Sequence, residues 1–164
     1  MSNNAQQALK RIFEPQSVAI IGLSRSAIGS PVSVLTTLQD YGYRGKIYVV
    51  NPNMTAPVDA GYEVHCEVHD LPAGVELAIV SVARESLLEV LKSCVARGIF
   101  TAIVVTQGLA DADEAGAQIQ QNAIDLCRQS GLRILGPNTI GVANAHHRFT
   151  SSFIEVHHDL TPIG

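Results

Sequence analysis

The chain has 164 residues, of which 46% are hydrophobic and 16% are charged, and its formal net charge is −4. This length suits one domain with a substantial core, and the negative charge excludes a general binder of nucleic acid or of anionic membranes. No apolar run reaches the roughly 18 residues of a membrane span, and the first residues lack the apolar core of a signal peptide. The three cysteines form no CxxC motif, so we expect reduced thiols in a soluble cytoplasmic protein.

The chain is predicted to begin with a short amphipathic helix over residues 3–13, and five short apolar runs rich in β-branched residues follow. Each run is nearly continuous in apolar residues rather than alternating, which is typical of strands that are covered on both faces. The runs are 17–22 (SVAIIG), 46–51 (KIYVVN), 76–82 (ELAIVSV), 100–106 (FTAIVVT) and 132–136 (LRILG).

Helical patterns separate these predicted strands. The first begins at Ser30, an N-cap followed by proline, and ends at Gly42. Two further apolar stripes, in 87–98 and 119–131, each contain a cysteine that we expect in the core (Cys94 and Cys127). Strands that alternate with helices indicate right-handed crossovers and a parallel sheet. The predicted fold is therefore α/β and Rossmann-like, doubly wound, with a mainly parallel five-stranded sheet and helices on both faces.

Two segments carry weaker patterns. The segment from Pro52 to Gly74 also holds Pro57, Gly61 and Pro72, which break helices and strands, and it predicts a loop with one short helical turn. Residues after Asn138 lack periodicity and resemble a connector. We therefore expect the domain to cover 1–144, and 145–164 to lead toward a further domain.

Polar or glycine-rich segments follow every predicted strand. In a doubly wound sheet, ligands bind at the carboxyl ends of the strands, beside the point where the strand order reverses. The segments thus predict one composite ligand site, although polar, glycine-rich loops are also ordinary in α/β proteins. They are 22–30, 51–52, 81–85, 106–108 and 136–138.

The first of these loops has the composition of a phosphate-binding loop. Gly22 and Gly29 let the backbone approach a ligand, and Ser24 and Ser26 add hydroxyl groups. A helix terminus contributes roughly 1–2 kcal/mol to anion binding, against roughly 8 kcal/mol for micromolar affinity. The loop can therefore locate a phosphate but needs further contacts, for which Arg25 is either an added cation or a solvated side chain.

Two features argue against a nicotinamide dinucleotide. The glycine spacing is G-x6-G rather than G-x-G-x-x-G, and the second strand ends in Asn51-Pro52 instead of an acidic residue. The G-x-x-x-x-G-K-[ST] motif of nucleotide-hydrolysing loops is also missing. The motif His65-Cys66-x-x-His69 fits no common metal site, and no set of nucleophile, base and orienting residue emerges. We predict no catalytic residue and no metal ligand.

Four segments together resemble the N-terminal CoA-binding domain of NDP-forming acyl-CoA synthetases. This family includes ADP-forming acetyl-CoA synthetases and relatives of the succinyl-CoA synthetase alpha subunit. The resemblance extends from Leu9 to Phe153 and rests on LKRIFEPQSVAIIGLS (9–24), GYRGKIYVVNP (42–52), DLPAGVELAIVSV (70–82) and RILGPNTIGVAN (133–144).

The resemblance implies coenzyme A as the ligand, with its phosphates on the first loop and its thiol end near Asn138. The succinyl-type enzymes carry Thr-Glu-Gly where this chain has Thr106-Gln107-Gly108, and Val82 is followed by Ala83 and Arg84 rather than by proline. The expected CoA-binding residues are Gly22, Ser24, Arg25, Ser26, Gly29, Asn51, Pro52, Val82, Arg84, Thr106, Gln107, Gly108 and Asn138.

By resemblance, the whole protein would convert an acid, ATP and CoA into acyl-CoA, ADP and phosphate through a phosphohistidine in another domain. ATP and Mg²⁺ would bind an ATP-grasp domain, so we expect ligase and ATP-grasp domains or subunits as partners, and a homo-oligomer is also compatible. Alone, the chain should bind CoA and catalyse nothing. A CoA-sensing regulatory module, free or fused to an acetyltransferase, is the alternative, and an NAD-binding redox sensor is a weaker one.

Overall fold

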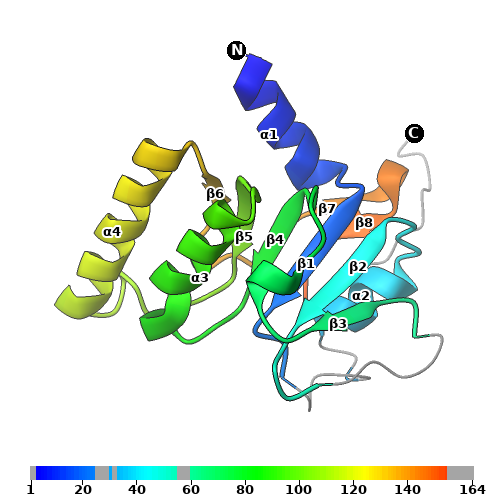
Figure 1. Cartoon of the computed structure of the whole chain (residues 1–164), viewed down its shortest axis with the longest axis horizontal. Coiled ribbons are helices and arrows are strands. Elements are labelled where there is room, and N and C mark those ends of the chain that lie inside the picture. Colours follow the sequence, from blue (N-terminus) through cyan, green and yellow to red (C-terminus); the bar gives the residue numbers. More distant parts are fainter. Residues whose placement is uncertain (1–2, 25–29, 31–32, 55–59, 155–164) are drawn as a thin grey trace, which may run out of the picture.

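A six-stranded parallel sheet with the order β3-β2-β1-β4-β5-β6 forms the centre of the molecule (Figure 1). The computed structural model describes residues 3–24, 30, 33–54 and 60–154. The sheet and its covering helices confirm the Rossmann-like doubly wound fold, with one strand more than the sequence predicted. The strands are β1 (Ser17–Ile21), β2 (Lys46–Val50), β3 (Glu63–His65), β4 (Leu77–Val80), β5 (Thr101–Val104) and β6 (Arg133–Leu135).

The sixth strand corrects the prediction for residues 52–74. Strand β3 pairs with β2 at the sheet edge, where Val64 lies opposite Val49. It has only three residues, two of them polar, and therefore lacks the apolar run that marked the other strands. The predicted helical turn is present as the 3₁₀ turn η2 (Val68–Asp70).

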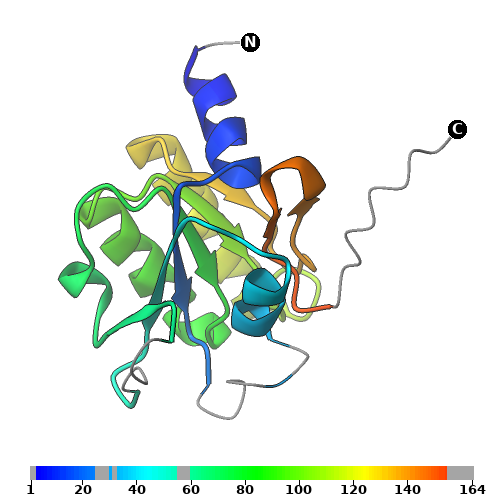
Figure 2. The same cartoon turned by 90° about the vertical axis from the view of Figure 1, so that its right-hand side faces the viewer.

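Helices and a hairpin cover the two faces of the sheet. One face carries α2 (Val34–Asp40), and the other carries α3 (Arg84–Ala96) and α4 (Glu114–Ser130) (Figures 1 and 2). The predicted first helix, α1 (Asn3–Phe13), stands at the end of the molecule opposite the carboxyl ends of the strands (Figure 2). Among the residues that the structure describes, no helix is both long and apolar enough to cross a membrane.

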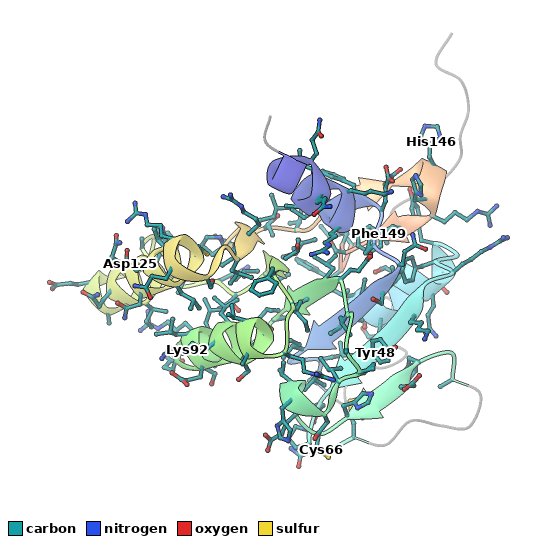
Figure 3. All side chains as sticks on the ribbon, turned by 45° about the horizontal axis from the view of Figure 1, so that its top comes forward. Tyr48, Cys66, Lys92, Asp125, His146 and Phe149 are labelled. Carbon is teal, nitrogen blue, oxygen red and sulfur yellow. The ribbon has the colours of Figure 1, made fainter. Side chains whose placement is uncertain are left out.

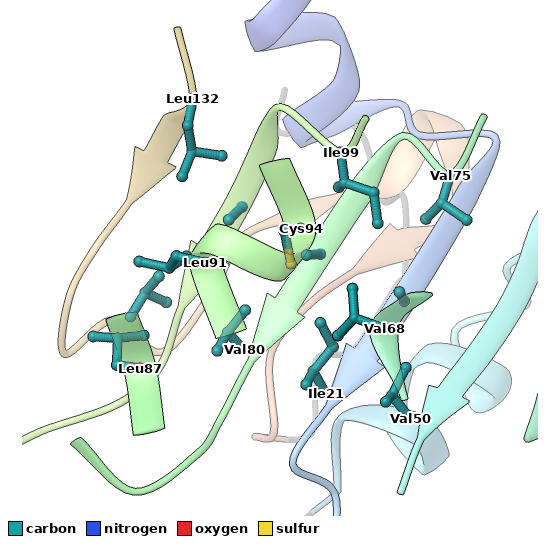
Figure 4. Packing of buried hydrophobic residues seen from close by; sticks show 14 of the residues in the cluster. Ile21, Val50, Val68, Val75, Val80, Leu87, Leu91, Cys94, Ile99 and Leu132 are labelled. Atoms are coloured by element: carbon teal, nitrogen blue, oxygen red, sulfur yellow. The ribbon is translucent and has the colours of Figure 1, made fainter. Parts of the chain in front are cut away.

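The apolar strands divide the core into two clusters. In β1, Val18 and Ile20 belong to the cluster on the α2 side, whereas Ala19 and Ile21 belong to the cluster on the α3 side. Every residue of β1 from 17 to 21 is buried. Neither face of this strand is open to water, so its apolar residues follow one another without the alternating polar residues of a half-exposed strand. Cys94 is completely buried on the α3 side, as predicted (Figure 4). Cys127 is only partly buried.

The sequence signals for helix ends predicted one boundary wrongly and another correctly. Helix α2 begins after Ser33, whose extended backbone and carbonyl start the helix, and not at Ser30 as predicted. Helix α4 ends at Gly131 with φ 80°, as the sequence indicated.

A hairpin extends the packed structure beyond residue 144, where the sequence analysis placed the domain boundary. Strands β7 (Ala143–Asn144) and β8 (Phe149–Thr150) pair antiparallel, with the 3₁₀ turn η3 (Ala145–His147) between them. Phe149 is completely buried against Tyr43, whose ring centroid is 5.5 Å away, whereas His146 projects outward (Figure 3). The apparently featureless tail therefore supplies a core side chain.

Candidate functional site

The strand order reverses between β1 and β4, and a crevice of about 300 Å³ opens there at the carboxyl ends of both strands. Ligands of doubly wound sheets bind at this position. The crevice has apolar walls and a few hydroxyl groups, the usual character of a small-molecule site. Its lining includes Ile79, Val105 and Phe153 together with Ser24, Ser33 and Ser81.

Gly22 brings the backbones of β1 and β4 together at this crevice. Its φ is 90°, and a Cβ atom at this position would lie 2.2 Å from the carbonyl oxygen of Ser81. No side chain other than hydrogen fits that space, so a glycine is required for both the turn and the close approach. Gly22 is therefore required by the contact between the two strand ends, and the approach of its backbone to a ligand stays a prediction.

Asn51 connects the end of β2 to the first loop. Its side-chain amide donates a hydrogen bond to the carbonyl oxygen of Leu23 at 2.7 Å, and its side-chain oxygen accepts one from the backbone N–H of Asn53 at 2.8 Å. The bond to Leu23 could not form with an acidic side chain at position 51, because a carboxylate cannot donate. Pro52 beside it is exposed.

Thr106 connects the ends of β4, β5 and β6. Its hydroxyl donates to the carbonyl oxygen of Val82 at 3.0 Å and accepts from the N–H of Val82 at 3.3 Å. Its own carbonyl oxygen accepts from the N–H of Asn138 at 3.1 Å. The Asn138 side chain then donates to Asp111 at 3.2 Å. Predicted site residues from three strand ends thus form one hydrogen-bonded row.

Arg84 is engaged in fixing the loop after β5. Its guanidinium donates to the carbonyl oxygen of Gly108 at 2.9 Å, to Asp113 at 2.8 Å and to Glu85 at 2.9 Å. The N–H of Gly116 and the Arg84 guanidinium lower the pKa of the Asp113 carboxyl. Arg84 therefore joins the starts of α3 and α4 beside the exposed Gln107, and its charge is already paired within the chain.

Ser33 is a site residue that the sequence analysis missed. It is 2% exposed and lines the crevice, and its hydroxyl has no hydrogen-bond partner in the described part of the chain. A buried hydroxyl without a partner destabilises the folded state, whereas a polar group of a ligand in the crevice would satisfy it. Phe153, which also lines the crevice, was assigned to the connector. No local pattern marks either residue, because the sheet alone brings them together.

Three of the expected residues, Arg25, Ser26 and Gly29, lie outside the described residues. Within 3–24, 33–54 and 60–154, no group of three or more His, Cys, Asp or Glu side chains is placed to hold a metal ion. His69 instead lies 3.1 Å from both Glu67 and Asp70.

Comparison with known families assigns the chain to one of them. A family model described as the CoA binding domain matches residues 16–145. The chain belongs to this family. The family resemblance in the sequence is confirmed.

Relatives of this CoA-binding domain include ADP-forming acyl-CoA ligases. The ADP-forming acetate–CoA ligase II of Archaeoglobus fulgidus is 37% identical over 148 residues, which cover 88% of this chain and 21% of that protein. A trans-feruloyl-CoA synthase from an unknown prokaryotic organism is 30% identical over 98% of this chain and 22% of that protein. The chain thus spans only about a fifth of the length of either relative.

Solved structures agree with this relationship. The dinucleotide forming acetyl-coenzyme A synthetase 1 of Ca. Korarchaeum cryptofilum, in complex with phosphate and ADP, superposes with a TM-score of 0.79 at 30% identity, covering 90% of this chain and 31% of that chain. The chain is accordingly a CoA-binding domain related to ADP-forming acyl-CoA synthetases.

Proposed function

We propose that this chain binds coenzyme A in the crevice between β1 and β4, as the CoA-binding domain of an ADP-forming acyl-CoA synthetase. The observation that carries the proposal is the crevice itself. It lies at the reversal of strand order, excludes a Cβ atom at Gly22, and contains the buried, unpartnered hydroxyl of Ser33. These features fit a ligand that needs close backbone contact for its phosphates and a hydrogen bond in an otherwise apolar pocket.

Each strand end has a role in this proposal. The first loop, with Gly22, Ser24, Arg25, Ser26 and Gly29, holds the phosphates through backbone N–H groups, hydroxyls and one cation. Asn51 and Pro52 border the nucleotide part of coenzyme A. The path of the pantetheine arm is formed by the remaining residues, which are Val82, Thr106, Gln107, Gly108 and Asn138. Arg84 fixes the loop after β5 beside this path.

The acyl transfer itself belongs to the whole protein in this proposal. A histidine of another domain would accept the γ-phosphoryl group of ATP, releasing ADP, and pass it to the acid. The thiol of the CoA presented by this chain would then attack the acyl phosphate, forming the thioester and releasing inorganic phosphate. Relatives are described as ligases of acetate and of 4-hydroxybutyrate and as a feruloyl-CoA synthase, so the acids differ among proteins with this domain. The full-length protein should release ADP when it receives acid, ATP and CoA, whereas this chain alone should release none.

Calorimetric titration of the 164-residue chain with CoA and with NAD tests the binding step. We expect heat of binding with CoA and none with NAD, because the end of β2 offers an amide where a nicotinamide dinucleotide needs an acidic partner for its ribose. A folded sample that gives no heat with CoA would contradict the proposal, and binding of NAD instead would support the redox-sensor alternative.

The variant Ser33→Ala tests the crevice directly. Removing the hydroxyl should weaken CoA binding by about 0.5–1.5 kcal/mol, while the free energy of unfolding stays equal or rises because an unpartnered buried group is lost. Ser93→Ala on the exposed face of α3 is the matched control and should leave CoA affinity unchanged. Unchanged affinity in Ser33→Ala would place the ligand outside this crevice.

A further inference from the structure

A second, larger hollow lies on the opposite face of the sheet from the crevice. It has a volume of about 370 Å³ and runs between α4 and the edge strand β6, with α3 and β5 beneath it. We call it the α4 groove. Its floor and walls are mainly apolar, and Figure 4 shows three of these side chains, Leu87, Leu91 and Leu132, in the cluster on the α3 side. Ala123, Ile124 and Cys127 of α4 form the opposite wall.

The α4 groove meets the candidate site at the carboxyl edge of the sheet. One end of it is formed by Leu109, which directly follows the site loop 106–108. Gly136 and Pro137, which directly precede Asn138, line the same end. The hydrogen bond from the N–H of Asn138 to the carbonyl oxygen of Thr106 joins the two segments. The groove therefore begins where the row of site residues ends.

The polar side chains that line the α4 groove are hydrogen-bonded or exposed, and the rest of its lining is apolar. The side-chain oxygen of Gln120 accepts a hydrogen bond from the N–H of Ala110 at 3.3 Å, which ties α4 to the site loop. Arg128 and Arg133 are exposed, and Arg128 is paired with Asp125 at 3.2 Å. None of the described residues that line the groove is acidic. Such a lining favours an uncharged apolar group over a polar one.

We propose that the α4 groove receives the acyl group of a CoA thioester and thereby favours apolar acids over acetate. This inference rests on the proposed function, in which the thiol end of CoA lies near Asn138, beside the mouth of the groove. An apolar cavity of about 150 Å³ already accommodates benzene, so the 370 Å³ groove suits a straight-chain or aryl acyl group of roughly six to ten carbons. Burial of such a group would also cover Ile124, which is 37% exposed.

Titration of the chain with CoA, acetyl-CoA and octanoyl-CoA separates this inference from the proposed function. We expect octanoyl-CoA to bind at least about tenfold more tightly than acetyl-CoA, because its additional methylene groups leave water. Equal affinities for the three ligands would leave CoA binding intact and overturn the acyl assignment. Failure of all three to bind would overturn the proposed function and the acyl assignment together.

Ala123→Phe should abolish the preference, because the larger ring occupies the groove. The ratio of octanoyl-CoA to acetyl-CoA affinity should fall to within about twofold of unity. Ala117→Phe introduces the same ring on the exposed face of α4 and should keep the full ratio. A ratio that survives in a folded Ala123→Phe variant, or that falls equally in both variants, would overturn the proposal.

Alkylation of Cys127 tests the groove without any substitution. Cys127 lines the α4 groove, whereas Cys66 is exposed elsewhere and serves as the internal reference. Octanoyl-CoA at saturation should slow iodoacetamide labelling of Cys127 by about threefold or more relative to acetyl-CoA, with Cys66 labelled equally under both ligands, because the acyl chain covers the thiol. Equal labelling of Cys127 under both ligands would contradict occupation of the groove.

Discussion

Gly22 illustrates how one residue serves both the fold and the site. It follows β1 directly, and its lack of a side chain allows the carbonyl of Ser81 at the end of β4 to approach. The contact sets the width of the crevice at the switch point. A residue that the sequence analysis named for contact with phosphate is thus also required for contact between two strands.

Gly22→Ala is expected to destabilise the domain more than Gly98→Ala. The two glycines have similar φ values of 90° and 85°, but a Cβ at Gly98 would meet no heavy atom within 4 Å. Gly98→Ala therefore measures the strain of positive φ alone, about 1–2 kcal/mol, and Gly22→Ala adds the clash with Ser81. Urea denaturation provides both free energies of unfolding, and equal losses would contradict the close approach of β1 and β4.

Cys94 should make stability depend on pH in the alkaline range. Burial raises the pKa of its thiol from 9.0 to about 12. The thiol ionises first in the unfolded chain, so its contribution to stability is complete below pH 9 and is lost as the pH rises toward 12. The loss at pH 10 should be about 1.4 kcal/mol.

Denaturation at pH 8 and pH 10 measures this effect, and Cys94→Ala is the reference, because it retains every other titrating group. The pKa of Tyr43 is also raised, by burial and by the Glu76 carboxylate, but a tyrosine ionises in the unfolded chain only near pH 10. The loss between the two pH values should be smaller in Cys94→Ala. An equal loss in both proteins would show that Cys94 does not carry the effect.

At the scale of elements, the starts of α3 and α4 are joined beside the site. Asp113 is the N-cap of α4, where its carboxylate accepts a hydrogen bond from the N–H of Gly116 at 2.7 Å, and it also pairs with Arg84 of α3. Because Arg84 additionally donates to the carbonyl of Gly108, both helices share one anchor with the loop after β5. The position of that loop therefore depends on two helix termini.

Two substitutions at Asp113 separate the cap from the ion pair. Asp113→Asn keeps an oxygen that can accept from Gly116 but loses the charge, and it should lower the thermal midpoint at pH 7 slightly. Asp113→Ala loses both interactions and should lower the midpoint more. Calorimetric melting of both variants checks this order, and equal effects of the two substitutions would mean that the ion pair with Arg84 dominates and the cap contributes little.

At the scale of the whole molecule, residues far apart in the sequence complete the core. The β7–β8 hairpin adds Phe149 to the cluster on the α2 side, and the Thr37 hydroxyl of α2 donates to the carbonyl of Ser152. Phe153, which follows these residues, lines the crevice. The segment after residue 144 therefore contributes both to the stability of the domain and to one wall of the site.

Phe149→Ala should reduce the free energy of unfolding by about 3–5 kcal/mol, because a fully buried aromatic side chain is removed. Phe100→Ala is the control, since Phe100 is 38% exposed and should contribute much less. Urea denaturation compares the two variants. Similar losses would mean that the hairpin packs only loosely on the sheet.

The sequence predicted most of the fold because strand and helix signals are local. Five continuous apolar runs became five strands of the parallel sheet, α1 has the expected extent, and α4 ends where expected but begins at Glu114, before the apolar stripe that predicted it. Strand β3 was missed because it is short and depends on the free edge of β2, and the hairpin was missed because its pairing involves only two residues on each side. Such elements are stabilised by pairing and packing with neighbouring elements, and their own sequences carry no periodic apolar pattern.

For the site, the sequence alone determined the fold class and the segments at the carboxyl ends of the strands, and the family entered through the resemblance of four segments. These follow from local composition and from the rule that parallel strands direct their carboxyl ends to one edge. Only the tertiary structure decided that Ser33 and Phe153 line the crevice, that Arg84 is already paired, and that α4 leaves an apolar groove. The physical reason is that a crevice or groove is a space between elements, and its walls come from residues whose sequence patterns indicate only burial.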